Sequence, residues 1–327
     1  MKRKNFFAIL SLLVSASILT ACTNNTQKVQ FSEYWHKDMN TPSATVLECL
    51  TYKVTTDTST AGSATYYSVD YNGTYTTVLE KNADNNYVYT TTLTVSAVYD
   101  YKTGKSPVLE DSITSKVVFQ NSANALKPLS SEKEIISHSP INAQIGAETD
   151  FNAWKTHCKV VVDYNANQST LYNLAKAETD DGYKTTDKIE VDEKDGKKYS
   201  QLDNEQLLFA LRGINPTTTT SPTLLVYSPF TETVQQIKAS IGTLAVAEDF
   251  TFHSVDEDKE IKDSISYYPI TLSINAKNTG GSHIAWIAKT TDANNNKYRN
   301  VMLKYQAPIA YSLGTLVYTL TSADFID

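Results

Sequence analysis

The chain has 327 residues and a formal net charge of −7, so acidic side chains outnumber basic ones. An acidic chain without a stripe of lysine and arginine does not present the basic surface that nucleic acid requires, and we expect no nucleic-acid partner. Tyrosine occurs 21 times, more often than phenylalanine and tryptophan together. This composition favours half-buried strands, because the tyrosine ring is apolar and its hydroxyl is polar.

The first 22 residues have the pattern of an export signal. Residues 2–4 are basic, and residues 6–19 form an apolar run that is too short to span a bilayer. The run leads into Leu19-Thr20-Ala21-Cys22, which resembles the lipobox of bacterial lipoproteins. The resemblance implies a diacylglyceryl group on the thiol of Cys22, cleavage before it, and anchoring at the extracytoplasmic face of the cell membrane. An ordinary signal peptide or a short buried helix is the alternative.

The predicted domain organisation follows from this start. We expect a signal peptide over residues 1–21, a lipidated tether over 22–43 and a single β-rich domain over 44–327. Residues 23–30 are polar and lack periodicity, as flexible tethers do. Three aromatic residues then follow at helical spacing, and they either dock a short helix on the body or lie at the lipid–water interface. They are Phe31, Tyr34 and Trp35.

Alternation with a period of two begins near Ala44 and is clearest from Tyr87 to Tyr101. The odd positions of this stretch are apolar or aromatic except Thr91, whereas most even positions are threonine, serine or aspartate. The pattern predicts an antiparallel strand with one buried face and one wet face. At about 3.3 Å per residue the strand would be roughly 50 Å long, a length typical of large curved sheets.

The same pattern predicts most of the remaining elements. Asn72-Gly73 and Asp195-Gly196 are hairpin signals between paired stretches, namely 66–72 with 74–81 and 188–192 with 197–201. Further strands are predicted over 108–120, 134–137, 268–274, 284–289, 301–305 and 316–320. One face of another strand is shared by Trp154, Cys158, Val160, Val162 and Tyr164.

One helix interrupts the strands. Asp203 and Gln206 have the spacing of a capping box, Gly213 marks the end, and the helix is predicted over 204–212. Its apolar face consists of Leu207, Leu208 and Leu211. Residues 213–223, rich in threonine and proline, are either a surface loop, which we favour, or a domain linker. Residues 228–242 fit a helix or a strand, and we favour the strand.

The stretch 203–213 (DNEQLLFALRG) resembles a feature of uncharacterised exported proteins with a lipoprotein-carrier-like half-barrel, in which an Asp-led helix packs on a curved antiparallel sheet. The C-terminal part is also similar, with Trp286 on a strand and Gly314 leading into Leu316, Tyr318 and Leu320. Polar insertions at 82–86 and 217–220 depart from the pattern. The resemblance implies a mainly β fold, a long curved antiparallel sheet or half-barrel with one or two short helices. It also implies a cavity for apolar groups, but no specific site residue.

The cysteines and histidines give no strong indication of chemistry. Cys158 shares an apolar face with Val160, whereas Cys49 is out of phase with Leu50, so two free thiols are favoured over a disulfide. No histidine is followed by a second histidine or a cysteine at a spacing of two to five residues, and His157 points away from Cys158 in a regular strand. Two stretches match only the first ligands of a calcium loop and are interpreted as turns. They are Asp163-Asn165-Asn167 and Asp292-Asn294-Asn296.

We therefore expect no enzyme, no metal and no cofactor, because no phosphate loop or hydrolase motif is present either. The favoured function is a non-catalytic binding or carrier module for lipid or another apolar group, held at the membrane through Cys22. The alternative is an adhesion or interaction protein that contacts glycan or protein through a face rich in tyrosine and threonine. The expected cavity is lined by Trp154, Trp286, Leu207, Leu208, Leu211, Tyr89 and Leu93.

Overall fold

The computed structural model describes the chain from residue 45 to residue 326 with gaps. The described residues are 45–60, 67–101, 104–122, 125–138, 151, 154–189, 193–194, 197–198, 201–214, 216, 221–229, 233–274, 282–289, 298–309 and 313–326. The predicted signal peptide and tether, including Cys22 and the aromatic residues that follow it, lie outside the described residues. So does the second calcium-like stretch at residues 292–296.

One wall of the fold is a run of long strands that follow one another along the chain. All neighbours in this wall are antiparallel, and the short β4 (Gly104–Lys105) pairs with the end of β3. A 3-10 turn, η2 (Thr58–Thr60), follows the first strand. In spatial order the strands are β1 (Thr45–Asp57), β2 (Tyr67–Lys81), β3 (Tyr87–Tyr101), β5 (Leu109–Ser122), β6 (Ala125–His138), β7 (Lys155–Asp163), β8 (Gln168–Asn173) and β9 (Lys184–Lys188).

The second wall comes from the C-terminal part of the chain. β1 pairs with both β2 and β19, so the first strand joins the two walls. In spatial order from β1, this wall contains β19 (Thr315–Phe325), β18 (Met302–Pro308), β17 (His283–Ala288), β16 (Lys259–Ser273), β14 (Thr233–Ile241), β13 (Thr223–Ser228) and β12 (Leu202–Asp203). β15 (Ala245–Ser254) pairs with β16 and reaches β19 at its end.

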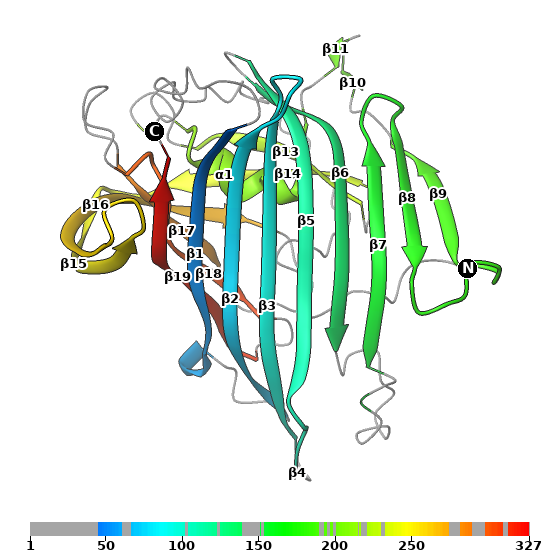
Figure 1. Cartoon of the computed structure of the whole chain (residues 1–327), viewed down its shortest axis with the longest axis horizontal. Coiled ribbons are helices and arrows are strands. Elements are labelled where there is room, and N and C mark those ends of the chain that lie inside the picture. Colours follow the sequence, from blue (N-terminus) through cyan, green and yellow to red (C-terminus); the bar gives the residue numbers. More distant parts are fainter. Residues whose placement is uncertain are drawn as a thin grey trace.

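The sheet is so strongly curved that its edge strand β12 comes to lie against β6 of the first wall, which gives a barrel-like shape (Figure 1). The edge strand β12 lies against β6, and the hydroxyl of Ser131 on β6 donates to Asp203 Oδ2 at 2.6 Å. β7, β8 and β9 continue the first wall beyond this contact, and β9 is the edge strand on that side. Three residues separate the short helix α1 (Leu207–Leu211) from the end of β12. The predicted curved antiparallel sheet with a short helix is therefore confirmed.

The interior of the barrel is the face that the alternating positions predict. In β3, every odd position from Tyr87 to Tyr99 is buried, and the even positions from Thr90 onwards are only partly buried or exposed. The same alternation along β7 buries Cys158 and leaves its ends exposed. Large aromatic side chains fill much of this interior. The buried rings include Tyr52, Tyr71, Tyr75, Tyr89, Tyr99, Tyr305 and Tyr318.

The predicted hairpin at Asn72-Gly73 is wrong, because these residues lie in the middle of the continuous strand β2. A Cβ built on Gly73 would come within 2.0 Å of the carbonyl oxygen of Thr94 and 2.6 Å of Val95 Cα on β3. Gly73 is thus required for a close approach between two strands. Glycine is favoured both in tight turns and where two backbones approach closely inside a sheet, and the neighbouring residues do not show which of the two applies.

The other predicted elements are found with altered bounds. β6 is a 14-residue strand that includes the predicted 134–137, and it accommodates Pro128 next to a register shift in its pairing with β5. The favoured strand interpretation of 228–242 is confirmed by β14. β10 (Glu193–Lys194) and β11 (Lys197–Lys198) pair across Asp195-Gly196, which confirms that hairpin. The helix begins with a 3-10 turn, η4 (Asn204–Gln206), before α1.

Candidate functional site

The segment from Asp203 to Arg212 lies inside the barrel and is the centre of the candidate site. All five residues of α1 are buried, and Arg212, which follows them, is only 3% exposed. The ring of Phe209 lies 5.0 Å from that of Tyr89 on β3 and 5.6 Å from that of Phe119 on β5, measured between centroids. The helix therefore packs its apolar side chains against the wall formed by the long strands.

The N-terminus of the helix is closed by the predicted capping box. Asp203 Oδ1 accepts a hydrogen bond from the backbone N–H of Glu205 at 2.9 Å, and Gln206 Oε1 accepts from the backbone N–H of Asp203 at 3.0 Å. These two contacts satisfy backbone donors that would otherwise be unpaired in the barrel interior. The capping box thus fixes the direction in which Asn204 and Glu205 project.

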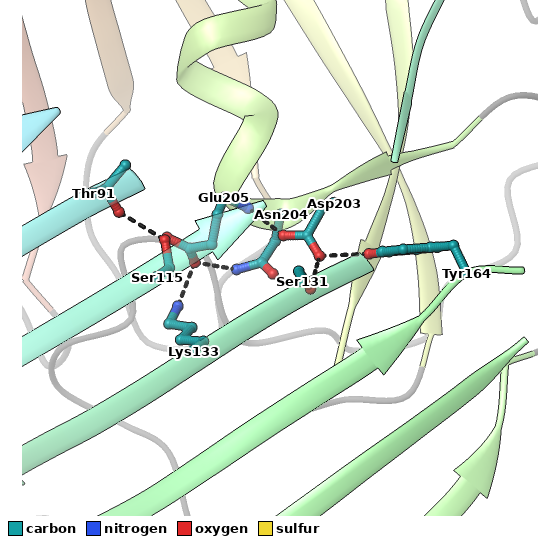
Figure 2. Close-up of polar contacts among 8 residues, drawn as sticks. All are labelled: Thr91, Ser115, Ser131, Lys133, Tyr164, Asp203, Asn204 and Glu205. Carbon is teal, nitrogen blue, oxygen red and sulfur yellow. Dashed lines mark hydrogen bonds and ion pairs between the residues drawn. The ribbon is translucent and has the colours of Figure 1, made fainter. Parts of the chain in front are cut away.

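The second carboxylate oxygen of Asp203 ties the segment to the first wall. Ser131 of β6 donates to Asp203 Oδ2 at 2.6 Å, and the hydroxyl of Tyr164 donates to the same oxygen at 2.5 Å (Figure 2). Burial raises the pKa of Asp203 even though these hydrogen bonds favour its ionised form. Burial, followed by the charge of Asp203, raises the pKa of Tyr164 well above its usual range.

Glu205 collects a second set of polar groups two residues further on. One of its oxygens, Oε1, contacts both Nζ of Lys133 on β6 and Nδ2 of Asn204, the latter at 2.6 Å. The other oxygen accepts from Ser115 Oγ at 3.3 Å, and Ser115 is hydrogen-bonded to Thr91 at 2.7 Å (Figure 2). The side chains of Lys133 and Glu205 are only 8% and 12% exposed, so this ion pair is largely desolvated.

The C-terminus of the helix is held by a buried ion pair to β1. Arg212 donates from its two terminal nitrogens to the two carboxylate oxygens of Glu48, at 2.6 and 2.8 Å. It also donates to the backbone oxygen of Arg299, and Asn300 donates to the backbone oxygen of Arg212. Burial disfavours the charged guanidinium, but Glu48 outweighs this and raises the pKa of Arg212. Polar side chains thus bind both ends of the helix to the barrel wall.

Tyrosine rings occupy the interior between these two anchors. The ring of Tyr75 on β2 lies 5.8 Å from Tyr52 on β1 and 5.5 Å from Tyr318 on β19, and Tyr318 lies 5.6 Å from Tyr305 on β18. Burial raises the pKa of Tyr89 to about 12. The hydroxyl of Tyr318 is buried and has no hydrogen-bond partner among the described residues. Most of the atoms that face the interior here are therefore apolar ring carbons, and the tyrosine hydroxyl groups are isolated polar points among them.

A second buried polar group lies further along β5. Asp111, which is 0% exposed, accepts hydrogen bonds at Oδ1 from the backbone N–H of His138 at 2.7 Å and pairs with His138 Nδ1 at 2.8 Å. Tyr99 donates to the backbone oxygen of His138 at 2.7 Å and is hydrogen-bonded to Tyr71 at 2.8 Å. Burial raises the pKa of Asp111 above its usual value.

The structure brings most of the predicted cavity residues to one interior. Leu207, Leu211, Tyr89 and Leu93 are all buried on the helix or on the inner face of β3. The remaining leucine of the helix, Leu208, is 6% exposed. Their packing is that of an ordinary hydrophobic core, because each belongs to the same large apolar cluster of buried residues.

The two tryptophans do not lie together. Trp154 is buried beside β7 with its ring edge-on to Tyr99 at 5.6 Å and to Phe151 at 5.0 Å. Trp286 alternates with Ala285, the buried residue that pairs with Tyr305, and so it lies on the other face of β17. There it stacks on Tyr267 at 4.4 Å, with Lys304 Nζ 4.9 Å from its ring centroid. Trp286 therefore does not face the helix.

Sequence reasoning missed the charged residues that hold the helix. Lys133 and Ser131 alternate with Glu132 and share the inner face of β6 with Ile135, so a longer predicted strand would have placed them inside. Glu48 lies next to Leu47 and Cys49 on β1 and carries no local signal of burial, yet it is 1% exposed. Its partner Arg212 is 164 residues away in the chain.

The calcium-like stretch at Asp163 is a turn, as expected. Asp163 Oδ1 accepts from the backbone N–H groups of Asn165 and Ala166, both at 2.9 Å, and Asn167 has a positive φ of 52°. Among the described residues, no group of three or more histidine, cysteine, aspartate or glutamate side chains is placed to hold a metal ion. Within the same residues no helix has the length and hydrophobicity needed to cross a membrane. Cys49 and Cys158 are free thiols on opposite faces of their strands.

Comparison with known proteins identifies the fold but not the activity. No protein-family model matches the chain, and no curated protein matches it. Among solved structures, the chain is similar to a β-barrel-like protein of a domain of unknown function, DUF1849, from Brucella abortus. The TM-score is 0.50 at 10% sequence identity, and the match covers 86% of this chain and 98% of that one. The body has a β-barrel-like fold. A likeness at this identity supports the fold alone.

Proposed function

We propose that this protein is a membrane-anchored, extracytoplasmic lipoprotein whose β-barrel-like body is a non-catalytic binding or carrier module for lipid or another apolar group. The observation that supports the carrier role is the inner wall of the barrel. Aromatic rings from β1, β2, β18 and β19 pack against one another inside the barrel, and Tyr89 on β3 packs against Phe209 of the short helix. Such a wall offers the apolar contact surface that binding sites for small apolar molecules use.

The way in which the helix is held supports the same proposal. Its apolar side chains pack against the wall without directional bonds, while Asp203, Glu205 and Arg212 supply the polar contacts at its two ends. Buried polar contacts of this kind add little to the free energy of folding, because desolvation offsets their attraction, but they specify where the helix lies. An apolar ligand would lie along the leucine face of the helix, where small shifts of the helix exchange protein contacts for ligand contacts.

The carrier proposal is tested by the lipid content of the purified protein. We expect the full-length chain, isolated from its membrane, to yield non-covalent lipid in an organic extract, close to one molecule per protein. Leu208→Trp should lower this content several-fold, because the larger ring takes up space beside the helix. Leu244→Trp is the matched control, since Leu244 is 45% exposed. An extract without lipid, or equal lipid in the control and in Leu208→Trp, contradicts the proposal.

The anchor is tested separately. Lipidation requires a thioether at the Cys22 thiol, so Cys22→Ala should move the protein from the membrane fraction to the soluble fraction and remove the diacylglyceryl mass from the N-terminal peptide. Cys49→Ala is the control, because Cys49 belongs to β1 in the body. A diacylglyceryl mass that persists in Cys22→Ala would show that the lipobox interpretation is wrong.

Adhesion is the second candidate, and the outer face of the long strands favours it. Thr51, Thr76, Thr92 and Thr114 are cross-strand neighbours on β1, β2, β3 and β5, and they form one row of hydroxyl and methyl groups. A neighbouring row contains Thr74, Thr94 and Ser112. If this face binds glycan or protein, Thr92→Lys should abolish cell-surface binding while leaving the lipid content unchanged. The carrier proposal predicts that neither property changes.

A further inference from the structure

The contacts of Lys133, Asn204 and Glu205 have a chemical meaning beyond holding the helix. One oxygen of Glu205 contacts both the side-chain nitrogen of Lys133 and that of Asn204, so the three groups meet at a single point (Figure 2). Asn204 is 1% exposed and Lys133 is 7% exposed. A primary amine, a carboxamide and a carboxylate therefore lie together in a site from which bulk water is largely excluded.

We propose that this is a self-modification site, where the chain forms an isopeptide bond between Lys133 Nζ and Asn204 Cγ with Glu205 as the proton carrier. The bond joins β6 to the start of the helix. It needs no external oxidant, activating group or second protein, because a primary carboxamide already contains its leaving group. The proposal is independent of the carrier role, since it concerns how the helix is attached and not what the interior binds.

The reaction balances with these three residues alone. The Lys133 ammonium first gives a proton to the Glu205 carboxylate, which leaves a neutral amine able to act as a nucleophile. The amine nitrogen attacks Asn204 Cγ, and the bond from Cγ to the amide nitrogen breaks. The leaving nitrogen takes up one proton from Glu205 and one from the attacking nitrogen and departs as an ammonium ion, which carries away the positive charge that Lys133 had at the start. Glu205 ends as it began, and the protein has exchanged one primary amide and one amine for one secondary amide.

The fold holds the reactants in place before the reaction. Ser131 and Lys133 are two residues apart on the inner face of β6, and they contact Asp203 and Glu205, which are also two residues apart. Asn204 lies between these two contacts, and the capping box fixes the backbone on both sides of it. Positioning of this kind converts an encounter between two groups into an intramolecular step and supplies much of the barrier reduction that such reactions need.

The carbonyl oxygen of Asn204 is a second, independent indication. Oδ1 is buried and has no hydrogen-bond partner among the described residues, although a buried carbonyl is normally paired. An unpaired carbonyl oxygen is able to accept a hydrogen bond as negative charge develops on it during the attack of Lys133. Glu205 accepts from Asn204 Nδ2, so it lies on the nitrogen side of the amide, where it can protonate the leaving group.

Peptide mass spectrometry of the full-length protein tests the proposal directly. Trypsin does not cleave after a lysine whose amine is acylated, so the bond would join residues 117–155 to residues 199–212 in one branched product. Its mass should be about 17 Da below the sum of the two peptides, which is the mass of one ammonia. If residues 117–133 and 199–212 are recovered as separate, unmodified peptides in full yield, the proposal is overturned.

Three variants assign the roles of the residues. Glu205→Gln and Lys133→Arg should each yield only unlinked peptides, because the first removes the proton carrier and the second removes the primary amine. Lys127→Arg is the matched control on the same strand; Lys127 is exposed, and its replacement should leave the branched product intact. A branched product that persists in Glu205→Gln would overturn the catalytic role of Glu205.

A thermal readout separates the bond from the ion pair that precedes it. Asn204→Ala keeps the contact between Lys133 and Glu205 but cannot form the bond, so it should unfold several degrees below the wild type, as expected when a cross-link over a loop of about 70 residues is lost. An unfolding temperature equal to that of the wild type, with no branched product in either protein, contradicts the proposal.

Discussion

The buried ion pair between Glu48 and Arg212 allows the sharpest test of how the helix is held. Their side chains are 1% and 4% exposed, and two short hydrogen bonds join them. Glu48→Ala removes the carboxylate but leaves the guanidinium buried, with the backbone oxygen of Arg299 as a remaining partner. Breaking a buried pair in this way costs about 3–5 kcal/mol, out of a total stability of roughly 5–15 kcal/mol for a protein.

Urea unfolding followed by tryptophan fluorescence measures this loss. In thermal unfolding of the same variant, at about 2–4 °C per kcal/mol, the midpoint should fall by about 6–20 °C. Asp100→Ala is the control, because its pair with Lys105 has side chains 49% and 68% exposed, and an exposed pair contributes less than about 1 kcal/mol. If Glu48→Ala unfolds no earlier than this control, the pair does not anchor the helix.

The double variant Glu48→Met with Arg212→Met refines the test. Replacing both charges by apolar side chains removes the desolvation cost together with the attraction, and such exchanges are often neutral in stability. We expect the double variant to regain most of the stability lost in Glu48→Ala. A double variant that is less stable than Glu48→Ala would mean that the hydrogen bonds to Arg299 and other groups dominate, contrary to the reasoning above.

Three further predictions follow from the described structure. Gly73→Ala should lower the free energy of unfolding by about 1–3 kcal/mol in urea titrations, because the new methyl group overlaps β3, and an equal midpoint would contradict the close approach. Burial lowers the pKa of His283 from 6.5 to about 4. Between these pH values the unfolded state binds more protons than the folded state, so the free energy of unfolding should fall as the pH drops from 7 to 4. His283→Gln should make the free energy of unfolding less dependent on pH in this range. In native protein Cys49 should alkylate before Cys158, whose pKa burial raises to about 12, and both should react after unfolding without reductant.

The sequence predicts the sheet well because apolar and polar residues alternate along each strand, and this pattern can be recognised without knowing the partner strand. Fifteen residues of β3 alternate almost without exception, so the strand, its length and its inward face follow from residues that are near one another. The error at Gly73 has the opposite cause. Asn-Gly satisfies the requirements of a turn, but the same glycine also satisfies a contact with β3, and only the partner strand decides between them.

The candidate site was predictable only in part for a similar reason. The capping box and the leucine face lie within ten residues, and both were found from spacing. The ion pair between Lys133 and Glu205 joins residues 72 positions apart, and the predicted strand 134–137 stopped one residue short of Lys133. The face of Trp286 was not decided by its neighbours, since the residues on both sides of it are apolar and either face of β17 could have pointed inward.

The pairing of the first strand with the last has a consequence for how the chain is assembled. β1 forms a ladder with β19 from Glu48 to Asp57, so β1 finds this partner only after residues 315–325 have been made. Long-range pairing of this kind slows folding, because a large loop must close before the contact forms. The same adjacency predicts that a circularly permuted chain, with residue 326 linked to residue 45 and new ends in the turn between β8 and β9, would still fold.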